Sequence, residues 1–126
     1  MFTLAEIVGG RLSPPFMPTK TQPYILGRLL HFPDDLAATR EDTVILPFDA
    51  ELLSVAVGAS RYYPTDRWSL TVNGEKVFDS VYTKDLPEGA FLVAVIPVAA
   101  GQVLKFSFDN TEGMAKYIWF NYQFLK

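Results

Sequence analysis

One stretch of alternating side chains, followed directly by a turn, constrains the fold of this chain more than any other feature. Trp68, Leu70 and Val72 alternate with polar residues, which is the two-residue period of a strand with one buried face. Asn73-Gly74 follows at once, and this pair is typical of a two-residue hairpin turn because both residues tolerate a positive φ. The sequence therefore predicts an antiparallel hairpin with a return strand within residues 76–82.

Similar short runs, separated by turn residues, continue along the chain. They cover residues 24–32, 43–48, 51–59, 91–98, 104–108 and 117–125. No segment of about ten residues has the 3.6-residue period of an amphipathic helix, and only residues 34–39 suggest a single helical turn. About eight short strands with turns between them are typical of an antiparallel sandwich. We expect an all-β, two-sheet, jelly-roll-like fold.

Two of these runs predict which side chains reach the core. Residues 51–59 carry the alternating set Leu53, Val55 and Val57, which predicts a half-buried strand. Residues 91–98 are almost continuously apolar, which predicts a strand buried on both faces.

The last run, residues 117–125, is aromatic on both faces. We expect one face to be core, and it holds Ile118, Phe120, Tyr122 and Phe124. The other face mixes polar and aromatic side chains, as interfaces and binding sites do. It holds Tyr117, Trp119, Asn121 and Gln123.

The first 23 residues differ from the rest because they are rich in proline. Proline fixes φ and removes a backbone donor, which excludes a regular helix or a central strand. Apolar residues such as Phe16 and Met17 do not suit a freely solvated tail. We therefore divide the chain into an extended N-terminal arm, residues 1–23, and a β-sandwich domain, residues 24–126. The arm is expected to pack on its own domain or on a neighbouring subunit.

The composition argues against several classes of protein. The 126 residues include no cysteine, which excludes disulfides, thiol catalysis and cysteine-ligated metals. The net charge is −3 without a basic cluster, so nucleic acid is not an expected partner. No apolar stretch of about 18 residues is present, so we expect no membrane span. The apolar residues 1–10 lack the basic flank of a signal peptide.

No set of side chains points to catalysis. His31 is the single histidine, and its place inside a predicted strand fits an outward-facing polar residue better than a catalytic triad. Most acidic residues lie in or beside predicted turns, where they usually cap the backbone. Neither Asp34-Asp35 nor residues 109–113 have the spaced ligands of a calcium loop. We predict a protein that is not an enzyme and binds no metal or cofactor.

The aromatic content is high, at 14% with ten phenylalanines. It implies either a heavily aromatic core or an apolar surface that meets a partner. Trp68 is expected in the core with Leu70 and Val72, whereas loop residues have less core to fill. The candidates for contacts with a protein or a glycan are Phe16, Met17, Tyr24, Tyr62, Tyr63 and Trp119.

The strand-rich part, residues 44–124, resembles small β-sandwich accessory proteins of tailed bacteriophages and prophages. The resemblance lies in residues 68–78 with their Asn73-Gly74 turn, in residues 81–84, in the turn at 86–89, and in residues 96–106 around Gly101. Proteins of that group are non-enzymatic parts of the capsid, neck, tail or baseplate. The resemblance implies assembly and surface attachment, and it implies no catalytic residues.

We therefore predict a structural or assembly protein of a phage or phage-like particle. It would be located in the virion and bound to further copies of itself or to other virion proteins. The alternative is a carbohydrate-binding module that attaches to a cell-surface glycan. Its rings would be Tyr62, Tyr63, Trp68 and Trp119, with polar contacts from Asp66 or Asn121. A hydrolase that uses acidic turn residues is a third class.

Overall fold

The computed structural model describes residues 18–83 and 88–126, with the backbone alone at residues 88–91, 93 and 94. Within these ranges the chain forms eight strands and no helix. In chain order they are β1 (Pro23–Phe32), β2 (Ala38–Ile45), β3 (Ala50–Ala59), β4 (Arg67–Val72), β5 (Glu75–Tyr82), β6 (Glu88–Val98), β7 (Val103–Asn110) and β8 (Lys116–Leu125). The predicted helical turn at residues 34–39 is wrong, since the chain only bends at residues 34–36 before β2 begins.

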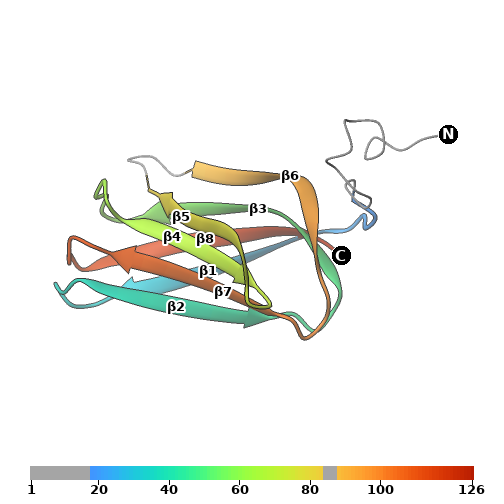
Figure 1. The fold of residues 1–126 in the computed structure, drawn as a ribbon, viewed down its shortest axis with the longest axis horizontal. Helices are drawn as coiled ribbons and strands as arrows, with labels where there is room; N and C mark the ends of the chain where they lie inside the picture. The colour runs from blue at the N-terminus through green and yellow to red at the C-terminus, as the bar shows by residue number, and fades with distance from the viewer. Residues whose placement is uncertain (1–17, 84–87) are drawn as a thin grey trace.

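The strands form two four-stranded sheets that pack face to face (Figure 1). The first sheet has the order β1-β8-β3-β6 and the second has the order β2-β7-β4-β5. All neighbouring strands are antiparallel. Because most consecutive strands lie in different sheets, the chain has the strand order of a jelly roll. The predicted all-β, two-sheet fold is confirmed.

Aromatic side chains from both sheets fill the core. The four residues predicted for the inner face of β8 are all fully buried. Phe120 of β8 stacks on Phe106 of β7, with 3.9 Å between ring centroids and 8° between ring planes. Trp68 is 4% exposed and lies against Phe106 and Phe78. The predicted core position of Trp68 is therefore confirmed, and these rings join the two sheets.

The predicted hairpin is also present. Asn73 and Gly74 have φ values of 50° and 88°, as a two-residue turn with two left-handed positions requires. Val72 pairs with Glu75 across the turn. The return strand continues to Tyr82, the longer of the two predicted ends.

The structure corrects two predicted strands near the start of the domain. Strand β2 begins at Ala38 and ends at Ile45, so it overlaps the predicted run 43–48 only at residues 43–45. It ends early because the chain turns at residues 46–49, where Pro47 has no backbone donor. In β3 the register with both neighbours shifts between Leu52 and Ser54. This bulge places Leu52 in the core and leaves Leu53 half-buried, so the predicted alternation from Leu53 is wrong there.

Strand β6 lies at the edge of the first sheet and not in its centre. Of its described side chains, Val95 and Val98 are buried, Ile96 is half-buried and Pro97 is exposed. The prediction of a strand buried on both faces is wrong for this part. Proline is tolerated at such a position because an edge strand leaves some backbone groups unpaired.

The two long edges of the sandwich differ. At one edge, Arg28 of β1 donates two hydrogen bonds to Asp42 of β2, at 2.8 and 2.9 Å. Arg40 of β2 donates to the carbonyl of His31 on β1 at 2.6 Å. These links join the two sheets along the β1–β2 edge. The opposite edge is formed by β5 and β6 (Figure 1).

Candidate functional site

The outer face of β1 and β8 carries a row of large exposed side chains. Strand alternation directs Ile25, Leu29 and His31 outward from β1, and Tyr117 and Trp119 outward from β8. Ile25 is 65% exposed, Leu29 51%, Tyr117 43% and Trp119 47%. The ladder pairs Leu29 with Trp119 and His31 with Tyr117. These five residues are called the β1–β8 face below.

The aromatic rings of the β1–β8 face stack on one another. His31 lies flat on Tyr117, with 4.2 Å between centroids and 4° between planes. Tyr117 stacks in turn beside Trp119 at 6.3 Å. Ser60, directly after β3, exchanges two hydrogen bonds with the backbone of Tyr117, at 2.8 and 2.9 Å. The row is thus fixed before any partner arrives, which lowers the entropy cost of binding.

A shallow depression of about 170 Å³ lies beside Trp119. Its lining includes the small residues Ala56 and Gly58 of β3 and the amide side chain of Asn121. A Cβ atom on Gly27 would lie only 3.0 Å from Oδ1 of Asn121. Because glycine has no side chain, the amide of Asn121 can lie over β1 at this position without a tight contact. An exposed ring therefore stands next to a polar group and a small-residue floor.

The remaining predicted site residues are dispersed. Tyr24 faces inward on β1, where its ring packs edge-on against Phe48 and the Lys126 ammonium lies 4.8 Å from its centroid. Tyr62 is exposed in the loop after β3, and Tyr63 in the same loop is half-buried. Tyr24 is therefore not part of the exposed surface around Trp119. Phe16 and Met17 lie outside the described residues.

Two residues assigned to a sugar platform are buried instead. Trp68 is in the core, and Asp66 is 1% exposed. The carboxylate of Asp66 pairs with the ammonium of Lys116 and accepts hydrogen bonds from the backbone N–H and the hydroxyl of Thr111. Neither residue can contact a glycan at the surface. No local sequence pattern indicates this pair, because its members are 50 residues apart.

Two more acidic residues considered for chemistry, Asp35 and Asp109, make contacts that stabilise the fold. Asp35 accepts the backbone N–H of Ala115 at 2.8 Å. Asp109 accepts the hydroxyl of Thr39 and the guanidinium of Arg67. Burial acts to raise the pKa of Asp109, but these hydrogen bonds outweigh it and hold the pKa below its ordinary value. The described residues contain no cluster of three or more acidic or histidine side chains suited to a metal ion.

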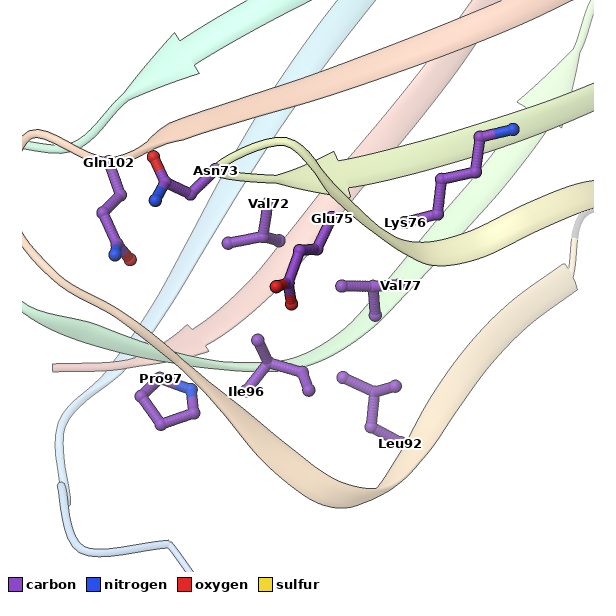
Figure 2. A pocket seen from close by; sticks show the side chains of 9 residues that line it. All are labelled: Val72, Asn73, Glu75, Lys76, Val77, Leu92, Ile96, Pro97 and Gln102. Carbon is purple, nitrogen blue, oxygen red and sulfur yellow. The ribbon is translucent and has the colours of Figure 1, made fainter.

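A second concave feature lies at the β5–β6 edge and was missed by the sequence analysis. It is a cleft of about 640 Å³ between the β4–β5 hairpin and β6 (Figure 2). Val72 and Val77 line one side, and Leu92 and Ile96 line the other. No local pattern could reveal it, because the cleft depends on how two edge strands from different sheets lie.

In the described part of the chain, no helix is long and apolar enough to cross a membrane.

Comparisons with known proteins place the chain in a family. Residues 20–126 match the family described as a domain of unknown function (DUF8551), and the chain belongs to this family. No curated protein matches the chain. Among solved structures, 82% of the chain aligns with 13% of dimeric latent PorU from Porphyromonas gingivalis, at 14% sequence identity and a TM-score of 0.35. A likeness this weak carries no argument about this chain.

Proposed function

We propose that this DUF8551 domain is a non-enzymatic assembly module of a phage or phage-like particle and works through its β1–β8 face. The observation that carries the proposal is the exposure of Ile25, Leu29, Tyr117 and Trp119 on one face of the first sheet. Soluble proteins rarely leave neighbouring large apolar side chains exposed unless the surface meets a partner. The phage particle is proposed from the resemblance of residues 44–124.

The composition of the face suits a protein interface. Tyrosine and tryptophan are enriched at interfaces, and the energetic centres of interfaces are often such rings. His31 and Asn121 provide polar groups within and beside the row. The non-enzymatic part of the proposal is supported by the acidic side chains, since Asp66 and Asp109 are engaged in pairs that stabilise loops.

Light scattering on a sizing column tests assembly, because it measures the mass of the full chain in solution. The first partner to test is a second copy, because symmetric homodimers are the commonest protein assemblies. We expect an oligomer that Leu29→Lys dissociates, because the substitution places a charge in the centre of the face. Ile45→Lys is the matched control, since Ile45 is 58% exposed but lies on β2. A wild-type monomer at all concentrations up to about millimolar would rule out assembly through a second copy.

A second candidate function is carbohydrate binding, favoured by the depression beside Trp119. An exposed indole next to Asn121 and a floor of Ala56 and Gly58 offers a sugar one ring to stack on and one amide for hydrogen bonds. The chain has two tryptophans, and Trp68 is buried. A glycan that binds here should therefore change the fluorescence of Trp119, and the change should vanish in Trp119→Phe. A glycan array without signal would exclude this candidate.

A further inference from the structure

The cleft at the β5–β6 edge lies between the terminal strands of the two sheets. In the described ranges β5 pairs only with β4, and β6 pairs only with β3. Each therefore has a second edge whose backbone N–H and C=O groups are available to another strand. Peptides commonly bind by extending such an edge, with backbone hydrogen bonds for affinity and side-chain pockets for specificity.

The lining of the cleft determines what kind of strand fits. Val77, Leu92 and Ile96 are only half-buried, and Figure 2 shows them facing the space between the hairpin and β6. Asn73 and Gln102 place amide groups at one end, and Glu75 of the hairpin directs its carboxylate into the cleft toward Ile96. An occupant with apolar side chains at alternate positions would bury these residues further, and it must have free backbone N–H groups. Proline-rich segments are therefore unsuitable.

We propose that residues 1–8 of this polypeptide occupy the cleft as an added strand. In this segment Phe2 and Leu4 alternate with Thr3 and Ala5, Glu6 follows on the face of Phe2 and Leu4, and the segment contains no proline. The prolines of the arm begin only at Pro14. The proposal does not depend on the function proposed above, because it uses a different surface of the domain.

The base of the arm is fixed close to the cleft. The carboxylate of Glu51, which is 3% exposed, accepts the backbone N–H groups of Thr19 and Lys20 at 2.9 and 2.8 Å. It also accepts the hydroxyl of Thr19 at 2.9 Å. Glu51 stands opposite Pro97 in the β3–β6 ladder, and Pro97 lines one end of the cleft. The arm therefore leaves the domain beside that end.

The length of the arm is sufficient to reach the cleft. Residues 9–17 connect the proposed strand to the fixed base, and extended chain spans at most about 30 Å over such a length. An eight-residue strand such as β5 is about 26 Å long. The segment can therefore reach the cleft of its own chain.

Cysteine cross-linking tests the contact in the full chain, which has no cysteine of its own. We expect the pair Leu4→Cys with Val77→Cys to form a disulfide under mild oxidation. The control pair is Leu4→Cys with Thr43→Cys, because Thr43 is exposed on β2 at the opposite edge. A cross-link within one chain places the segment in its own cleft, and one between two chains makes the contact an exchange between copies. Either supports the proposal, whereas equal cross-linking of both pairs overturns it.

Hydrogen exchange on the chain without cysteines gives an independent measurement. Strand addition should slow the exchange of the amides of residues 2–8 by about tenfold or more relative to free peptide. Leu4→Asp should abolish this protection while leaving the core of β8 protected, which shows that the domain is still folded. Unprotected amides in the wild-type chain overturn the proposal. Leu29→Lys should not alter either result, which separates this proposal from assembly through the β1–β8 face.

Discussion

The ammonium group of Lys116 lies against the carboxylate of Asp66 inside the sandwich, where the two side chains are 0% and 1% exposed. Asp66 lies just before β4, and Lys116 begins β8. The second oxygen of Asp66 accepts two hydrogen bonds from Thr111, after β7. The pair therefore joins three segments at one end of the domain. Burial of a charge is tolerated there only because each charge has its partner.

We predict that removal of one member of this pair is strongly destabilising. Lys116→Met leaves the carboxylate of Asp66 buried without its counter-ion, which should lower the free energy of unfolding by about 3–5 kcal/mol. Urea unfolding at pH 7 measures this change. The double variant Asp66→Leu with Lys116→Met should lose much less than the sum of the two single losses. Additive losses would contradict the coupling.

The exposed pair of Lys76 and Asp79 provides the control. Their side chains are 55% and 62% exposed, and the ammonium lies 3.0 Å from the carboxylate. Water screens such a pair, so Lys76→Met should leave the unfolding curve unchanged.

The strand pattern was predictable because it follows from local sequence. Alternation places Leu70 and Phe120 in the core whatever the neighbouring strands are, and the Asn73-Gly74 turn depends on two adjacent residues. The exposed position of Trp119 follows from the same period.

The remaining features depend on contacts between distant parts of the chain. The bulge beside Leu53 shifts the strand period by one residue, and nothing in the apolar run of β3 marks its place. From the sequence, Asp66 is indistinguishable from an ordinary turn residue, and only the fold shows that it pairs with Lys116. Glu51 is buried because Thr19 and Lys20 fold back onto it from the arm. The cleft arises only where two sheet edges meet.

Glu51 should make the attachment of the arm sensitive to acid. Burial acts to raise its pKa, but the hydrogen bonds from the Lys20 and Thr19 backbone and from the Thr19 hydroxyl outweigh burial and lower the pKa from the ordinary 4.5. A lowered pKa means that the stabilisation is complete above pH 4.5 and is lost as the pH falls through the folded-state pKa. The NMR amide shifts of Thr19 and Lys20 should titrate with a midpoint below 4.5. Glu51→Gln should remove the titration. A midpoint above 4.5 in the wild-type chain would refute the prediction that the pKa of Glu51 is lowered.

Gly113 should be far less replaceable than Gly101, although both have a positive φ, of 81° and 85°. A Cβ on Gly113 would lie 2.7 Å from the backbone nitrogen of Ala37, whereas a Cβ on Gly101 meets nothing within 4 Å. Gly101→Ala should cost only the conformational strain of about 1–2 kcal/mol. Gly113→Ala must also displace backbone, so it should cost clearly more. Thermal unfolding of both variants measures the difference, and equal costs would show that residues 36–37 move aside easily.

The hydroxyl of Tyr122 should contribute nothing to stability. The hydroxyl oxygen is buried and has no hydrogen-bond partner among the described residues, and burial raises the pKa of this phenol. Tyr122→Phe removes a polar group that lost its water on folding, so the free energy of unfolding should stay the same or rise. Ser54→Ala is the matched contrast, because the Ser54 hydroxyl donates to Gln123 at 2.7 Å in the same sheet. Its loss should cost about 1 kcal/mol. If urea unfolding shows a similar loss for Tyr122→Phe, the phenol must have a partner in solution, and an ordered water near Arg28 and Asp42 would then be the first to look for.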